Sequence, residues 1–156
     1  MADTQDTVTL ALSGEEILLR RLVPAVLLVL GLSVLGLAAW LRPDPHGLGT
    51  HEELGLPACA FYLTTGYPCA TCGMTTSFAW AAHGHLLMAF YTQPAGALLA
   101  LLTAACVLVC AWALVTGADL APLARRVLRP GTFLAAGVII LGAWGYKVLT
   151  VRGIFP

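Results

Sequence analysis

The stretch LVPAVLLVLGLSVLGLAAWL, residues 22–41, decides the class of fold of this chain. It contains no charged side chain, and arginines bracket it at Arg20, Arg21 and Arg42. A helix rises about 1.5 Å per residue, so about 20 apolar residues are needed to cross a bilayer core about 30 Å thick. Residues 22–41 are therefore predicted to form a transmembrane helix.

The composition of the whole chain agrees with this prediction. Of the 156 residues, 59% are hydrophobic and only 10% are charged, against about 25% charged in a typical soluble domain. So few charged side chains cannot cover a water-facing surface, and an ordinary soluble protein is excluded. Lys and Arg equal Asp and Glu at eight each, and no run of basic residues indicates a nucleic acid partner.

Two further stretches are long and apolar enough to span. Residues 95–116 follow Pro94, which fits the first turn of a helix because no backbone donor is lost there, and they end before Gly117. Residues 133–151 contain a single charge, Lys147. This lysine is near the end of the span, so we expect its ammonium to reach the headgroup region.

A fourth segment, residues 72–91, has the length of a span but carries several hydroxyl and imidazole side chains. With three spans, the basic residues before the first span and between the last two lie on one side of the membrane, as the positive-inside rule requires. A fourth span would separate them. The arginines that set this topology are Arg20, Arg21, Arg125, Arg126 and Arg129. Residues 72–91 are therefore predicted to be interfacial or re-entrant.

The predicted fold is an all-α integral membrane protein with three transmembrane helices and one interfacial or re-entrant helix. No small-residue cleavage pattern follows the first apolar run, which argues against a cleaved signal peptide. The predicted parts are a polar cytoplasmic segment at 1–21, transmembrane helices at 22–41, 95–116 and 133–151, an outward loop with a cysteine turn at 42–71, the interfacial helix at 72–91, a basic cytoplasmic loop at 117–132 and a short outward tail at 152–156.

Three of the five cysteines lie close together in the segment PACAFYLTTGYPCATCG, residues 57–73. They are Cys59, Cys69 and Cys72, and a Gly-Tyr-Pro turn comes directly before the last two. Thr71 is expected to cap a helix that begins near Cys72. A helix N-terminus favours the thiolate form, which gives Cys72 a physical route to reactivity.

Three interpretations of these cysteines stay open. Thiols outside the cytoplasm tend to be oxidised, so Cys59 can form a structural disulfide with Cys69 or Cys72, or the thiols simply pack. The C-x-x-C spacing of Cys69 and Cys72 is also that of a metal-ligand pair, with Cys59 as a third ligand and His46 or His51 as a fourth. The same pair could exchange disulfides, although no thioredoxin-like pattern surrounds it.

The segment from Cys59 to Pro94 resembles a family of small bacterial membrane proteins classed as a domain of unknown function. The family signature is Cys-Pro, then Thr-Gly-x-Pro-Cys-Pro-Gly-Cys-Gly-x-Thr-Arg, then Gly-Asp and Asn-Pro. The matching residues here are Cys59, Thr65-Gly66, Pro68-Cys69, Cys72-Gly73, Thr75 and Pro94, with departures at Ala60, Ala70, Thr71, Thr76, His85 and Gln93. The resemblance implies a multi-pass protein of the bacterial cytoplasmic (inner) membrane, with no established activity.

Other soft or titratable side chains are expected to be structural. On a continuous helix, eleven residues place His83 about 16 Å from Cys72 along the axis, too far to share a metal ion. His83 and His85 are therefore expected at headgroup level. Cys106 and Cys110, four residues apart in the second span, are expected to pack as small apolar side chains.

No phosphate-binding, dinucleotide-binding, zinc-protease or serine-hydrolase motif occurs in the sequence, so an enzyme is unsupported. We expect a non-enzymatic subunit of a membrane complex, in which the cysteine turn fixes the interfacial helix. The alternative is a thiol-redox or metal-handling membrane protein that uses Cys59, Cys69 and Cys72. The expected partners are the lipid bilayer and other membrane subunits or a second copy. No cofactor is expected, with a metal ion as the alternative.

Overall fold

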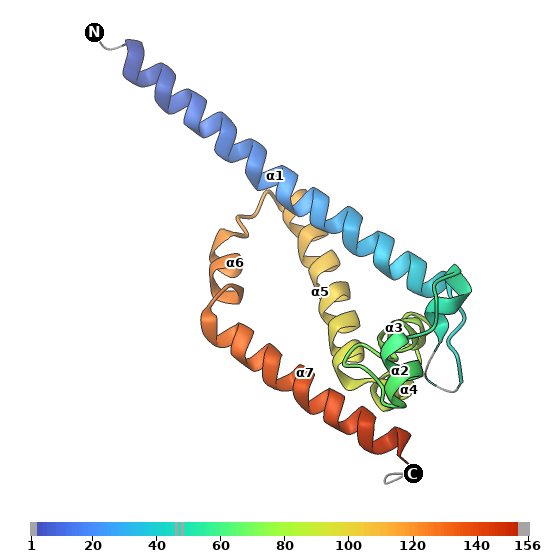
Figure 1. The fold of residues 1–156 in the computed structure, drawn as a ribbon. Coiled ribbons are helices and arrows are strands. Elements are labelled where there is room, and N and C mark those ends of the chain that lie inside the picture. Colours follow the sequence, from blue (N-terminus) through green and yellow to red (C-terminus); the bar gives the residue numbers. More distant parts are fainter. Residues whose placement is uncertain (1–2, 46, 48, 153–156) are drawn as a thin grey trace.

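The structure is a computed structural model that describes residues 3–45, 47 and 49–152. Within these residues the chain forms helices and no strand, which confirms the all-α class. In chain order the elements are α1 Asp3–Trp40, the 3-10 helix η1 Thr50–Leu54, α2 Ala60–Thr65, α3 Met74–Ala82, α4 Leu86–Thr92, α5 Pro94–Thr116, α6 Ala121–Val127 and α7 Pro130–Val151 (Figure 1).

Three of these helices are long and apolar enough to cross a membrane. They are the part of α1 from Arg20 to Trp40, α5, and α7. The rest of the chain covers little of them, because only 11%, 22% and 11% of their most apolar windows are buried. Helices with so many uncovered apolar side chains need an apolar environment, so the three helices are suited to lipid.

α1 and α5 pack side by side along much of their length (Figure 1). Small residues of both helices are buried, among them Ala38 of α1 and Ala97, Ala100 and Ala113 of α5. At Gly31 the approach is so close that an added Cβ would lie 2.5 Å from Cγ2 of Val107. Small side chains let two backbones approach closely, which is how helices associate in lipid, where no hydrophobic effect drives them together.

α7 diverges from α5 and returns to the rest of the chain at its C-terminal end (Figure 1). There its side chains hydrogen-bond to α4 and to the turn before α3. The helices α3 and α4 pack against each other and against α5, and α3 also packs against α1. At the opposite end of the spanning part of α1, Arg20 forms an ion pair of 3.5 Å with Asp119, in the connection between α5 and α6. This arrangement agrees with three spans whose connections alternate between the two ends.

The segment at 72–91 is not one helix, as the sequence predicts, but two. α3 ends at Ala82 and α4 begins at Leu86, with Gly84 between them at a φ of +81°. Residues with a Cβ rarely adopt this left-handed conformation, and it ends the helical hydrogen bonding of α3. The break lets α3 and α4 fold against each other beside α5.

Candidate functional site

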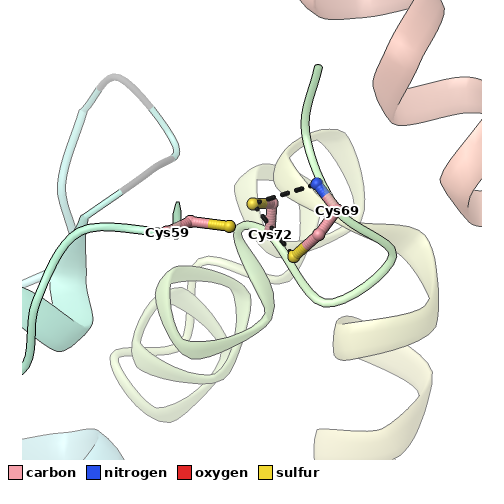
Figure 2. Close-up of side chains that lie close together, drawn as sticks. All are labelled: Cys59, Cys69 and Cys72. Atoms are coloured by element: carbon pink, nitrogen blue, oxygen red, sulfur yellow. Dashed lines mark hydrogen bonds between the residues drawn. The ribbon is translucent and has the colours of Figure 1, made fainter. Parts of the chain in front are cut away.

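Three cysteine sulfurs meet at the end of the molecule where the short helices gather. The Sγ atoms of Cys59, Cys69 and Cys72 all lie within 4.8 Å of one another. Cys59 comes directly before α2, whereas the other two lie in the turn between α2 and α3. Figure 2 shows the Cys59 side chain directed toward the Cys69 and Cys72 pair. The fold thus brings together the three cysteines that the sequence singles out.

The turn from Pro68 to Gly73, here called the cysteine turn, is held by short-range hydrogen bonds. The backbone N–H of Cys72 donates to the carbonyl oxygen of Cys69 at 3.0 Å, and that of Met74 to Thr71 at 3.1 Å. The two sulfurs of Cys69 and Cys72 are 3.2 Å apart (Figure 2). The N–H of Cys69 also donates to Sγ of Cys72 at 3.2 Å. This geometry places both sulfurs on the same side of the turn.

Thr71 is not the N-cap of a helix, contrary to the sequence-based expectation. α3 begins at Met74 and its N-cap is Gly73, with a φ of +83°. The hydroxyl of Thr71 instead lies 3.2 Å from Sγ of Cys69. The interaction that favours a thiolate here is therefore a side-chain hydrogen bond at Cys69, and not a helix N-terminus at Cys72.

The pair releases its first proton near neutral pH. Burial acts to raise the pKa of the Cys69 thiol, but hydrogen bonds from the side chains of Thr71 and Cys72 outweigh it and lower the pKa from 9.0 to about 7. Burial raises the pKa of Cys72 to about 12, and its hydrogen bond to Cys69 adds to this increase. At pH 7.5 Cys69 is mostly a thiolate that shares the remaining proton of Cys72.

Side chains from distant parts of the chain fix the cysteine turn from outside. The indole Nε1 of Trp144, in α7, donates to the carbonyl oxygen of Pro68 at 3.0 Å. The amide Nε2 of Gln93, at the junction of α4 and α5, donates to the carbonyl oxygen of Ala70 at 3.1 Å. Gln93 is fully buried. The turn is therefore positioned by two of the three spanning helices.

Lys147 does not extend to the headgroup region, as expected from the sequence, but folds inward. It is only 5% exposed, and its Nζ donates to the carbonyl oxygens of Thr92 at 3.0 Å and Gly47 at 3.3 Å. A Cβ added to Gly73 would lie 3.2 Å from this Nζ. The turn of α7 that carries Lys147 faces the short helices, so the ammonium reaches protein carbonyls instead of water.

A cavity of about 760 Å³ opens beside the three sulfurs. Its apolar lining includes Val34 and Leu37 of α1, Leu41 directly after α1, and Leu99 of α5. All three cysteines, His51 and Glu52 also line the cavity. A ligand or an ion can therefore reach the sulfurs from this cavity.

The histidines do not join the sulfur cluster in the described part of the chain. His51 lines the cavity but lies outside the group of three sulfurs, and His46 lies outside the described residues. Nδ1 of His83 hydrogen-bonds to the carbonyl oxygen of Ala79 at 2.8 Å. His85 makes an edge-to-face contact with Trp80.

The remaining cysteines form a separate pair within α5. The sulfurs of Cys106 and Cys110 are 3.9 Å apart, with Cys110 buried and Cys106 exposed. They do not take part in the site at the other end of that helix.

Sequence reasoning missed the three residues that surround the cysteine turn, namely Gln93, Trp144 and Lys147. A signal existed for two of them. Lys147 is the single charge in the third span, and Gln93 occupies the position before Pro94 at which the resembled family has Asn. Nothing in the sequence singles out Trp144, because one tryptophan near the end of a span is typical of membrane helices.

The part of the chain that carries the cysteine turn matches a known family of proteins. Among curated proteins and among solved structures, no match to the chain is found. The part of the chain that matches a known protein family includes all three cysteines, the helices α3 and α4 and the first part of α5. Residues 59–107 match the family described as "Protein of unknown function (DUF2752)", which confirms the resemblance that the cysteine pattern indicates.

Proposed function

We propose that this chain is a membrane protein that binds a thiophilic metal ion, such as Zn²⁺ or Cu⁺, through Cys59, Cys69 and Cys72. The observation that carries the proposal is the convergence of three sulfurs within 4.8 Å. Zn–S bonds of about 2.3 Å place the sulfurs of a tetrahedral site about 3.8 Å apart. The three cysteines therefore need only small shifts to surround one ion.

The electrostatics of the site support the same proposal. Thiolates and not thiols bind metal ions, and the pKa of Cys69 of about 7 provides one thiolate at neutral pH. A bound cation then displaces the protons of the other two thiols, because metal binding is coupled to deprotonation of its ligands. Soft thiolate ligands select ions such as Cu⁺ and Zn²⁺ over hard cations.

Three protein sulfurs leave the fourth position of a tetrahedral ion free for another donor. His51 lines the same cavity as the sulfurs and is a candidate for this donor. A water molecule or a donor group of a ligand could enter from the cavity instead. Trigonal Cu⁺ would require no fourth ligand.

The metal content of the purified protein tests the proposal. Full-length protein in detergent is incubated with Zn²⁺, desalted and analysed for bound metal. We expect about one ion per chain in the wild type, and loss of the ion in Cys59→Ser, Cys69→Ser and Cys72→Ser. The matched control is the double variant Cys106→Ser/Cys110→Ser, which should keep the ion. Equal metal content in wild type and Cys59→Ser would contradict a three-sulfur site.

Thiol–disulfide exchange is a second candidate, which the Cys69 and Cys72 pair favours. Their sulfurs lie 3.2 Å apart, and Cys69 has the low pKa of an attacking thiolate. Cys69 would attack a partner disulfide, and Cys72 would then displace the partner from the mixed disulfide, leaving a Cys69–Cys72 disulfide and a reduced partner. Cys59 is not needed for this reaction. A Cys59→Ser variant that keeps exchange activity while wild type binds no metal would favour this candidate.

The wider cellular setting is part of the proposal. The protein would lie in a bacterial inner membrane. The end of the molecule that carries Arg20 and Arg125 would face the cytoplasm, and the cysteine turn would lie outside. The ion pair of Arg20 with Asp119 supports a common side for the basic segments. A metal-filled cysteine turn would also hold the short helices against the spans, as expected of a non-enzymatic subunit of a membrane complex.

A further inference from the structure

The buried ammonium of Lys147 lacks an obvious counter-charge. Its Nζ donates to two neutral acceptors, the carbonyl oxygens of Thr92 and Gly47. Within the described residues it forms no ion pair with a carboxylate. The small cavity next to it is lined by Pro45, Gly47, Tyr91, Thr92, Thr150 and Val151. A buried cation is costly unless an anion compensates it, so the structure should supply negative charge nearby.

The cysteine turn lies beside Lys147, and the three cysteines of the site carry negative charge once a metal ion displaces their protons. Gly73 follows Cys72 directly, and a Cβ at Gly73 would lie 3.2 Å from Nζ and 3.4 Å from Cε of Lys147. The ammonium therefore approaches the backbone of the turn closely at a residue that has no side chain. Cys72 is also the titratable group that interacts electrostatically with Lys147.

We propose that Lys147 is the counter-charge of the three-sulfur site, and that it stabilises the thiolates which bind the metal ion. This inference rests on the proposed metal-binding function. Three thiolates and a divalent cation carry one net negative charge, and the ammonium of Lys147 balances it. Lys147 is a positioning residue and not a ligand, because an ammonium has no lone pair to offer a metal ion.

The proposal explains why α7 meets the rest of the chain at this place. Trp144 reaches the cysteine turn at Pro68, and Tyr146 donates to the carbonyl oxygen of Tyr91 at 3.3 Å. Lys147 adds a charge to these neutral hydrogen bonds. The third span therefore holds the cysteine turn in place and supplies the positive charge that balances the site. The ligands of the site all come from the segment before α3.

Cd²⁺ titration of full-length protein in detergent tests the proposal, with thiolate-to-metal charge-transfer absorption as the readout. Lys147→Met removes the ammonium and its donors, whereas Lys147→Gln keeps N–H donors for the two carbonyls without the charge. We expect both to bind Cd²⁺ about tenfold more weakly, since a buried cation beside the turn stabilises thiolate ligands even at an effective dielectric constant of about 20. Lys147→Arg, which keeps the charge, should restore binding to within about twofold.

Arg152→Met is the matched control for loss of a cation from the end of α7. Arg152 is exposed and stacks on the ring of Tyr67, with its Cζ 4.7 Å from the ring centroid. Solvent screens its charge, so Cd²⁺ affinity should not change. If Lys147→Met and Lys147→Gln bind Cd²⁺ with the affinity of the wild type, the counter-charge proposal is overturned. It is also overturned if Lys147→Arg binds Cd²⁺ as weakly as Lys147→Met does.

The same titration keeps the inference separate from the proposed function. If wild type binds no Cd²⁺, the proposed metal binding fails and the counter-charge fails with it. If wild type binds Cd²⁺ and Lys147→Gln binds it equally well, metal binding stands and the counter-charge alone is overturned.

Discussion

At the residue scale, the chemistry of the site depends on a hydroxyl whose position in the sequence indicates a different role. Thr71 is a polar residue next to Cys72, which is typical of a helix cap. In the structure its Oγ1 lies 3.2 Å from Sγ of Cys69, where it lowers the pKa of that thiol. A cap requires the backbone to enter a helix directly after it, and here Gly73 turns the chain first. We therefore expect Cys69, and not Cys72, to be the more reactive of the two thiols.

The pH dependence of alkylation checks this assignment. In metal-free protein, the rate at Cys69 should rise with pH with a midpoint at about pH 7, because the thiolate is the nucleophile and its pKa is about 7. Thr71→Val removes the hydroxyl and should move the midpoint upward, toward the ordinary value of 9.0. Thr71→Ser keeps the hydroxyl and is the control. Mass spectrometry of labelled peptides gives the rates, and a midpoint unaffected by Thr71→Val would contradict the assignment.

A hydrogen bond that joins α7 to the cysteine turn gives a second prediction at this scale. Trp144→Phe removes the donor to the carbonyl oxygen of Pro68, which should cost about 1 kcal/mol of stability. The metal affinity should fall as well, because the turn loses a positional constraint. Trp112→Phe is the control, since Trp112 is 59% exposed. Thermal unfolding in detergent measures the stability, metal titration measures the affinity, and equal unfolding midpoints for the two variants would disprove the role of Trp144.

At the element scale, two glycines of α1 show how the fold uses close helix approach. Gly31 faces Val107 of α5, whereas a Cβ added at Gly36 would have open space around it, with no atom of the described residues within 4 Å. Both lie in the same apolar helix and are indistinguishable by composition. The contact between α1 and α5 decides which of them the structure requires.

Substituting each glycine with alanine separates packing from helix propensity. Gly31→Ala should destabilise the protein by about 1–3 kcal/mol, because the new Cβ would be 2.5 Å from Cγ2 of Val107. Gly36→Ala should be neutral or stabilise by up to about 1 kcal/mol, because Ala forms helices better than Gly. Thermal unfolding of the two variants under the same detergent conditions makes the comparison. A more stable Gly31→Ala protein would mean that α1 and α5 are less closely packed.

At the scale of the whole molecule, three helices with alternating connections place the cysteine turn and the basic loop at opposite ends. The C-terminal ends of α1 and α7 both lie near the short helices, and α6 lies at the other end (Figure 1). Arg125, Arg126 and Arg129 belong to the α6 region, at the same end as Arg20. The positive-inside rule then predicts a cytoplasmic basic end and an external cysteine turn.

Reporter fusions test this orientation. An enzyme that is active only outside the cytoplasm should be inactive when fused after Gly117 and active when fused after Val151, because α7 crosses the membrane between these points. Replacing Arg125, Arg126 and Arg129 with Gln should weaken this asymmetry. The opposite pattern would show an inverted protein, and equal activities would show that α7 does not span.

The sequence by itself determined the helical membrane class, the three spans and the cluster of Cys59, Cys69 and Cys72. These follow from local properties: apolar length sets a span, and sequence proximity brings the cysteines into one segment. Only the tertiary structure decided that Gly84 breaks the segment at 72–91, that Lys147 folds inward, and that Gln93 and Trp144 fix the cysteine turn. The hydrogen bonds of Gln93, Trp144 and Lys147 join residues that are 23 to 100 positions apart in the sequence. These bonds form only when α5 and α7 have packed around the turn.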